Sequence, residues 1–172
     1  EWAPRDEVLS WAKNLCNSDK YKDFKVIVLT HSYLTGGPNC RKTSMKNSSY
    51  KIHPANQGQE MWEKLVYPCK NIRLVLCGHT GERGEVFEKN TAYLVEKNSA
   101  GKTVHQMMFN NQYIGGNTFG SGGDGWVRLL EFLPDGKTVK VSTNSPLFGI
   151  SPVTKRFAHR IGKCDQFDMV IE

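Results

Sequence analysis

The sequence lacks any apolar run long enough to cross a membrane. A spanning helix needs about 20 consecutive, mostly apolar residues, whereas the apolar runs here have the length of a strand. A concentrated basic face is also missing, because the lysines and arginines behind the net charge of +6 are scattered. The densest group, Arg41, Lys42, Lys46 and Lys51, has no accompanying aromatic residues and fits a solvated loop. We therefore expect neither a membrane span nor a nucleic-acid interface.

The spacing of the cysteines fits no metal or disulfide pattern. The five cysteines are odd in number and include no Cys-x-x-Cys pair, so neither a cysteine zinc site nor a disulfide scaffold is indicated. Cys77 lies in an apolar run, where a cysteine usually behaves as a small hydrophobic residue. The chain also shows no signal peptide and begins at Glu1. We expect either that its N-terminus was processed or that it is part of a longer chain.

The sequence has the size and composition of one globular domain, residues 1–172. With 38% hydrophobic and 10% aromatic residues, a chain of this length can bury roughly 70% of its unfolded surface. Apolar periodicity predicts helices over residues 4–16 and 58–66, and buried strands over 25–30 and 72–77. This alternation is typical of a parallel sheet with helical crossovers, and thus of an α/β fold.

The second half of the sequence has α+β character, with strands and turns in place of helices. We expect strands over residues 86–96, 103–113, 126–132, 138–142 and 167–171. The sequence Pro134-Asp135-Gly136 is a strong hairpin signal between two of them. We expect this half to form an antiparallel layer beside the parallel one. Between the first two buried strands, residues 36–59 form a long polar stretch of the kind that often carries function.

Two buried strands each end in a histidine. His31 follows strand 25–30 directly, and His79 follows strand 72–77 after Gly78, which allows a sharp turn. Because ligands of open α/β sheets bind at the carboxyl ends of the strands, we predict that His31 and His79 converge on a metal ion there. Metal sites need three or more protein ligands, so on residue type alone two ordinary strand-end histidines remain the alternative. His53, in the polar stretch, is expected to be exposed.

Several motifs, taken in order, resemble a known family over nearly the whole chain. They are Val26-Ile-Val-Leu-Thr-His31, Gly58…Trp62-Glu-Lys-Leu-Val66, Ile72-Arg-Leu-Val-Leu-Cys-Gly-His79, Val104-His-Gln-Met-Met…Asn111-Gln112, Gly125-Trp-Val-Arg-Leu-Leu-Glu-Phe132, Ser142-Thr-Asn-Ser-Pro146 and Asp165-Gln-Phe167. This order resembles the C-terminal half of calcineurin-like metallophosphoesterases, in particular a group of bacterial, often exported phosphohydrolases. An exported or periplasmic location is implied by the same resemblance.

The resemblance implies a four-layer α/β sandwich that binds two divalent ions of the Mn, Fe or Zn type, bridged by an aspartate. His31 matches the histidine of the family's fourth motif, and Gly78-His79 matches the start of the fifth, Gly-His-x-His. By that pattern, both histidines serve the same metal. Paired metals hold the phosphate and activate the attacking water, so the implied activity is hydrolysis of a phosphate mono- or diester.

Two departures from the family pattern limit what this chain can do alone. Gly81 stands where the second histidine of the fifth motif would bind the other metal, and the first three motifs, Asp-x-His, Gly-Asp and Gly-Asn-His-Asp/Glu, are absent. We therefore predict the C-terminal portion of a phosphoesterase, inactive by itself, whose catalytic and substrate-binding residues are unassigned here. A sheet that normally pairs with upstream strands would expose an apolar edge, so we also expect self-association.

Two other functions are considered. Because Gly81 stands where the family pattern has a histidine, the first alternative is a degenerate, non-catalytic domain of the same fold that binds a ligand or a partner. A serine hydrolase built on His31 and Ser32 is disfavoured, because the sequence contains no Gly-x-Ser-x-Gly elbow.

Overall fold

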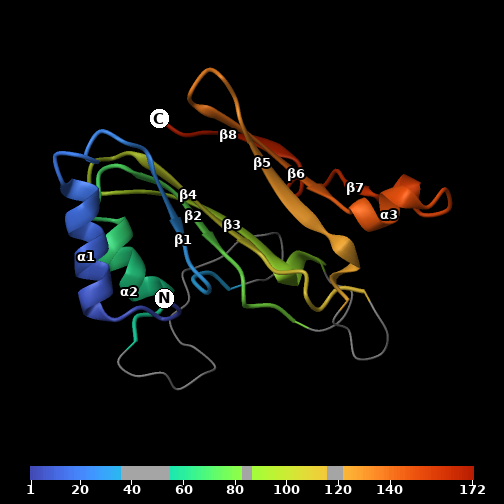
Figure 1. Ribbon diagram of the computed structural model, residues 1–172, viewed down its shortest axis with the longest axis horizontal. Coiled ribbons are helices and arrows are strands. Elements are labelled where there is room, and N and C mark those ends of the chain that lie inside the picture. The colour runs from blue at the N-terminus through green and yellow to red at the C-terminus, as the bar shows by residue number, and fades with distance from the viewer. Residues whose placement is uncertain (36–54, 83–86, 116–121) are drawn as a thin grey trace.

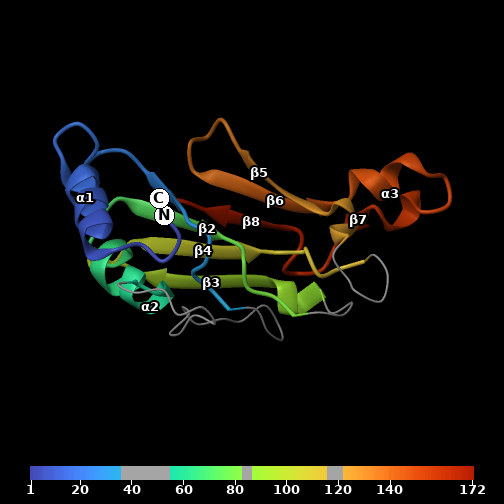
Figure 2. The same ribbon diagram turned by 60° about the horizontal axis from the view of Figure 1, so that its bottom comes forward.

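The computed structural model describes residues 1–35, 55–82, 87–115 and 122–172, and these residues form three layers (Figures 1 and 2). Helices cover one face of a mixed four-stranded sheet, and a second, antiparallel sheet packs on the other face. The mixed α/β fold class is confirmed at this level. Among the described residues, no helix is both long and apolar enough to span a membrane.

Two helical segments form the first layer, close to the predicted positions. Helix α1 (Asp6–Asn17) begins with two acidic residues, which the positive end of the helix dipole favours. Helix α2 (Gly58–Met61) continues into a π-helical turn (Trp62–Val66), in which the Tyr67 amide donates to the Trp62 carbonyl at 2.7 Å. Because this bond spans five residues rather than four, it widens the last turn before the chain enters the sheet.

The first sheet has the strand order β1-β2-β4-β3. Strands β1 (Val26–Leu29), β2 (Ile72–Cys77) and β4 (Thr103–Phe109) are parallel, and β3 (Thr91–Lys97) pairs with β4 in the antiparallel direction. The expectation that the second half of the chain forms a separate antiparallel layer is therefore wrong for β4. The tight β3–β4 hairpin returns the chain beside β2 and in the same direction as β2.

Two predicted boundaries in the second half also differ from the structure, and one helix there is an addition to the prediction. The strand expected from residue 86 begins at Thr91, because a 3₁₀ turn (Phe87–Asn90) precedes it. The strand expected to reach residue 113 ends at Phe109. A short helix, α3 (Pro146–Ile150), was not predicted; the Ser145 side chain caps it by accepting a hydrogen bond from the Phe148 amide at 3.1 Å.

The second sheet is built around β6 (Thr138–Asn144). Strand β5 (Val127–Phe132) lies on one side of it, and β7 (His159–Arg160) and β8 (Phe167–Val170) lie on the other. The predicted β5–β6 hairpin is confirmed. Its turn is held by the Asp135 carboxylate, which accepts hydrogen bonds from the Thr138 hydroxyl and from the amides of Thr138 and Lys137. These bonds, that of the hydroxyl first, lower the pKa of Asp135 to about 2.

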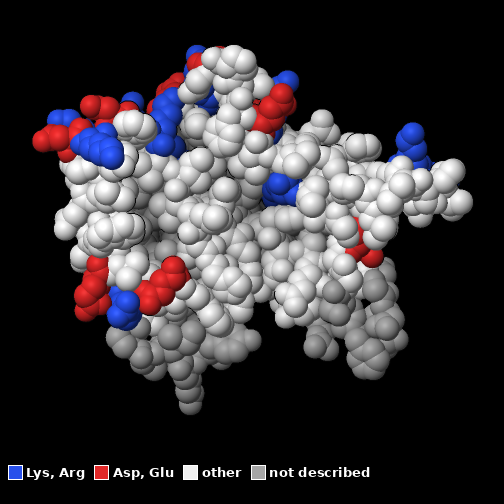
Figure 3. Space-filling model, viewed as in Figure 1, with Lys and Arg blue, Asp and Glu red and all other residues white. Residues whose placement is uncertain are grey.

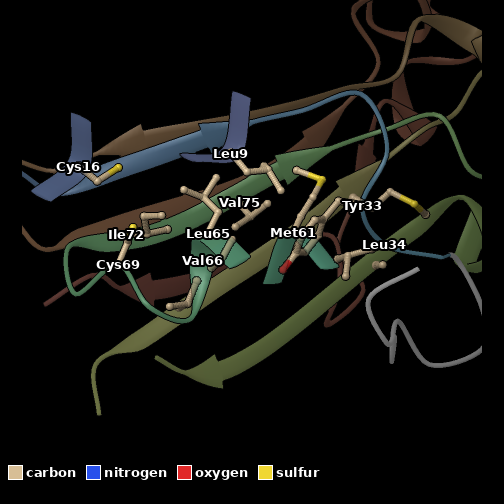
Figure 4. Packing of buried hydrophobic residues seen from close by; sticks show 13 residues of the cluster. Leu9, Cys16, Tyr33, Leu34, Met61, Leu65, Val66, Cys69, Ile72 and Val75 are labelled. Atoms are coloured by element: carbon tan, nitrogen blue, oxygen red, sulfur yellow. The ribbon is translucent and has the colours of Figure 1, made fainter. Parts of the chain in front are cut away.

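Two apolar clusters join the layers, and β2 contributes to both. Figure 4 shows the cluster between the helices and the first sheet, which includes Leu9, Leu65 and Val75. The cluster between the two sheets includes Leu74 and Val141. Burial on both faces explains why β2 is almost entirely apolar, as its sequence predicted.

Three of the cysteines, Cys16, Cys69 and Cys77, are free, and Cys16 and Cys69 are buried. Cys164, by contrast, is disulfide-bonded. The odd count and irregular spacing of the cysteines gave no indication of this bond. Burial raises the pKa of the Cys77 thiol to about 12, as expected for a small apolar core residue.

Candidate metal centre

His31 and His79 meet at the carboxyl edge of the first sheet, as predicted from the sequence. Their strands β1 and β2 are parallel neighbours, so both chains leave the sheet at the same edge. The Gly78 amide donates to the His31 carbonyl at 3.0 Å and keeps the two segments paired past the strand ends. His31 Nε2 lies 2.9 Å from His79 Nδ1, and the ring centres are 4.5 Å apart.

The backbone at His79 adopts an unusual conformation. Its φ is +64°, in the left-handed region that favours glycine. The Thr80 amide donates to the Gly78 carbonyl at 2.8 Å, which makes His79 the central residue of a three-residue turn. Such strained residues persist only where their surroundings hold them, and they cluster at functional sites. The turn therefore indicates that the position of the His79 ring matters.

Asn110, at the end of β4, holds this turn in place. Its Nδ2 donates to the carbonyl oxygens of His79 and Thr80 at 2.7 and 3.1 Å. The Thr80 hydroxyl donates to the Leu34 carbonyl at 2.6 Å and ties the turn to the segment after His31. Three parallel strands thus contribute to one site, because β1 and β2 supply the rings and β4 supplies the amide that positions one of them.

Trp2 packs against both histidines from the N-terminal segment. The centre of its ring system lies 5.0 Å from that of His31 and 4.7 Å from that of His79. Its indole N–H donates to the hydroxyl of the buried Ser32 at 2.9 Å, which fixes the orientation of the ring. The adjacent Ala3 also has a positive φ of +47°, so the chain bends sharply where it brings Trp2 to the site.

The surroundings favour the neutral form of His79. Burial and, secondarily, the neighbouring His31 lower the pKa of His79 below its ordinary value of 6.5. A histidine must be neutral to offer a lone pair to a metal. His79 is therefore ready to act as a ligand at neutral pH.

The two ring nitrogens face each other at a distance somewhat shorter than that between two ligands of one zinc ion. Imidazole nitrogens bind zinc at about 2.0–2.1 Å in tetrahedral geometry, so two of them on one ion lie roughly 3.3 Å from each other. The observed 2.9 Å between His31 Nε2 and His79 Nδ1 is the length of a hydrogen bond between the rings, so the rings would have to move slightly apart to share an ion. Among the residues that the structure describes, no group of three or more His, Cys, Asp or Glu could hold a metal. The described residues therefore supply two histidine rings at this edge and no complete coordination shell.

Sequence reasoning found the two histidines but missed Trp2 and Asn110. Asn110 directly follows a parallel strand, as His31 follows β1. A prediction that ended this strand at Phe109 instead of residue 113 would have placed Asn110 at the same edge of the sheet as the histidines. No sequence signal places Trp2, because its partner Ser32 is 30 residues away along the chain. His53 and most of the polar stretch 36–59 lie outside the described residues.

A hollow of about 490 Å³ lies at another place in the molecule, beside β7 and α3. Its wall includes Trp126, Phe148, Arg156 and Arg160. The Arg160 guanidinium lies 3.7 Å from the centre of the Phe87 ring, and its Nε is 3.2 Å from the Asp165 carboxylate. The hollow combines aromatic and cationic side chains and is of the size that small ligands occupy.

Comparison with known proteins gives a relative without an assigned function. The chain is 28% identical, over 148 residues, to the uncharacterized protein YvnB of Bacillus subtilis (strain 168). The match covers 84% of this chain and 10% of that protein, so the chain spans about a tenth of the length of its relative. No protein-family model matches the chain, and no solved structure matches it. Any functional statement therefore depends on the site itself.

Proposed function

We propose that this chain is the C-terminal portion of a metal-dependent phosphoesterase of the calcineurin-like type. In this proposal, His31 and His79 bind the same divalent ion. The observation that supports it most strongly is the 2.9 Å spacing of His31 Nε2 and His79 Nδ1 at the carboxyl edge of a parallel sheet. The left-handed backbone of His79 supports it further, because strained residues of this kind cluster at functional sites.

The chain's own residues would hold and orient the ion. The rings of His31 and His79 supply two neutral nitrogens, and Asn110 fixes the peptide of His79 through its carbonyl. Trp2 packs against both rings and would help to hold their orientation. A bound divalent ion supplies a Lewis acid for the phosphoryl oxygens and lowers the pKa of bound water.

The proposal requires ligands from outside the described residues. Two histidines are too few for tight binding of a metal, and the motifs that would supply the bridging aspartate and the acid for the leaving group are absent from the sequence. We propose that a longer polypeptide supplies them and that the 172-residue chain alone is inactive. The substrate would be a phosphate mono- or diester, and the location exported or periplasmic.

A phosphatase assay tests the proposal. The 172-residue chain and a longer polypeptide encoded with its upstream sequence are assayed on p-nitrophenyl phosphate and bis(p-nitrophenyl) phosphate, with added Mn²⁺ or Zn²⁺. We expect metal-dependent hydrolysis only by the longer polypeptide, and its loss in His31→Ala and His79→Ala. His159→Ala, which removes an exposed histidine elsewhere, is the matched control. Inactivity of both polypeptides, or activity unaffected by both site substitutions, contradicts the proposal.

The second candidate function is a non-catalytic domain of the same fold that binds a ligand. The aromatic and cationic hollow beside β7 favours it, because its size suits a small molecule and its arginines suit an anionic one. The two functions separate experimentally: a Trp126→Ala substitution abolishes ligand binding in the second case and leaves metal-dependent hydrolysis unchanged in the first.

A further inference from the structure

We propose that a lobe at the end of the second sheet docks on the surface of an anionic lipid bilayer. The lobe comprises residues 146–163, which include α3, a 3₁₀ turn (Lys155–Phe157) and β7. It projects from the molecule at the end opposite to helix α1 (Figures 1 and 2). The inference is independent of the proposed function, because the lobe shares no residue with the site at His31 and His79.

The lobe exposes several large apolar side chains. Ile150 and Val153 are each 78% exposed. They lie at the tight turn after α3, in which the amides of Thr154 and Lys155 donate to the Ser151 carbonyl at 3.2 and 2.8 Å. The other exposed apolar residues of the lobe are Leu147, Phe157 and Ile161. Exposed apolar groups gathered in one part of a molecule mark interaction surfaces, so the lobe has the character of a docking surface.

The charged residues of the lobe are all basic. Its sequence contains Lys155, Arg156, Arg160 and Lys163 but no aspartate or glutamate. Arg160 is paired with the Asp165 carboxylate, 3.2 Å from its Nε. The other three are exposed, and none of them forms an ion pair with a described residue. Three unpaired cations therefore lie beside the exposed apolar side chains and favour an anionic partner.

An anionic bilayer matches both features of the lobe. Interfacial membrane binding combines apolar side chains, which enter the boundary between headgroups and acyl chains, with basic side chains that attract anionic headgroups. Each Lys or Arg near such a surface strengthens binding by a factor of about five. A bilayer also requires no groove of matching shape, and Figure 3 shows that the lobe is a projection with few charged side chains on the face in view.

The lobe overlaps only in part with the hollow beside β7. Arg156, Phe157 and Ile161 line that hollow, whereas Ile150 and Val153 are not part of its wall. Substitutions at Ile150 and Val153 therefore separate docking on a bilayer from binding of a small molecule in the hollow. Because both side chains are mostly exposed, their replacement should leave the fold intact.

Flotation with lipid vesicles tests the inference. The 172-residue chain and the longer polypeptide are mixed with vesicles of phosphatidylcholine, alone or with phosphatidylglycerol, and a sucrose gradient separates vesicle-bound protein from aggregates. We expect both polypeptides to float with the phosphatidylglycerol vesicles, and the bound fraction to fall at high NaCl concentration. Combining Ile150→Ser with Val153→Ser should weaken binding at least about tenfold. The matched control, Phe24→Ser, removes a 60% exposed apolar side chain between α1 and β1 and should bind like the wild type.

Removing the cations of the lobe tests the choice of an anionic surface. We expect Lys155→Gln combined with Arg156→Gln to weaken binding to the phosphatidylglycerol vesicles about 25-fold. Lys102→Gln combined with Lys140→Gln removes two other exposed lysines and should leave binding nearly unchanged. Equal binding to both kinds of vesicle, or binding that the lobe substitutions do not weaken, overturns the inference.

Two further outcomes concern other occupants of the lobe. If neither polypeptide binds vesicles, the inference is overturned in favour of a protein partner. If the 172-residue chain binds vesicles and the longer polypeptide does not, the rest of the protein covers the lobe, and the inference is overturned for the longer polypeptide as well.

Discussion

His79 combines a strained backbone with a depressed pKa, and both features have local causes. The left-handed φ arises in the three-residue turn closed by Thr80 and Gly78, and burial beside His31 lowers the pKa of the ring. A non-glycine residue in this conformation costs about 1–2 kcal/mol. In this turn His79 Nδ1 lies 2.9 Å from His31 Nε2.

Replacing His79 by glycine should relieve this strain. We expect the His79→Gly variant to have a free energy of unfolding about 1 kcal/mol higher than His79→Ala, because glycine adopts a positive φ without steric cost. The order should reverse at His31, which is not among the described residues with positive φ. Urea denaturation of the four variants measures both differences. A His79→Gly variant less stable than His79→Ala would show that the turn is not strained.

Removing the side chain of Asn110 should loosen the same turn. The Asn110→Ala variant loses the bonds to the carbonyls of His79 and Thr80, so we expect a loss of about 1–3 kcal/mol in the free energy of unfolding and weaker zinc uptake by His31 and His79. Asn14→Ala removes an exposed amide from the surface of α1 and should change stability by less than about 0.5 kcal/mol. Equal effects of the two substitutions would exclude a special role for Asn110.

At the scale of the elements, local chemistry decided what the sequence could predict. Strand β2 could be predicted because a strand that is buried on both faces needs a run of apolar residues. The β5–β6 turn could be predicted because Asp135 and Gly136, which are adjacent in the sequence, close it. The direction of β4 and the approach of Trp2 depend on contacts between distant segments. The spacing of apolar residues along the sequence carries no information about such long-range contacts. The direction of β4 and the position of Trp2 could therefore be learned only from the structure.

His105 joins three strands through its ring and should make stability depend on pH. Its Nδ1 lies 2.6 Å from the Tyr93 hydroxyl on β3, and its Nε2 lies 2.9 Å from the Val170 carbonyl on β8. Burial lowers the pKa of His105 below 6.5. Above pH 6.5 the ring is neutral in both the folded and unfolded chains. As the pH falls, the unfolded chain takes up a proton first, so stability decreases until the folded ring is also protonated.

Thermal unfolding between pH 7.5 and pH 5 measures this dependence. We expect the melting temperature to fall as the pH decreases, and to fall less steeply in a His105→Gln variant. His79 contributes in the same direction, since its pKa is also lowered, so a His79→Ala variant serves as the comparison. A melting temperature that is constant over this range, or an unchanged slope in His105→Gln, contradicts the assignment.

At the scale of the whole molecule, each of the two sheets ends in a strand whose outer edge is not paired with another described strand. Strands β1 and β5 each lie at the end of their sheet's strand order. Leu29 on β1 is 81% exposed, and Ile27, Leu129 and Phe132 are also exposed. Figure 3 shows charged side chains over the ends of α1 and the β5–β6 hairpin, while the surface over β1 carries few charges. Unpaired apolar edges of this kind invite pairing with another strand.

The 172-residue chain should therefore self-associate. We expect a dimer or higher oligomer by light scattering at high concentration, and a shift toward monomer in Leu29→Lys, because a charge at the edge opposes burial. Ile161→Lys changes a residue that is 83% exposed away from β1 and β5 and should leave the association unchanged. A clean monomer at high concentration contradicts this prediction.

The central claim, that His31 and His79 bind one ion together, is tested most directly by nuclear magnetic resonance of the histidine ring nitrogens. The longer polypeptide, which would carry the remaining ligands, is labelled with ¹⁵N at its histidines and titrated with ZnCl₂ at pH 7.5, and His105 and His159 serve as internal references. We predict that the resonances of His31 Nε2 and His79 Nδ1 shift together, with one binding curve, and that either alanine substitution abolishes both shifts. Shifts at only one of the two nitrogens, or at neither, would contradict the claim.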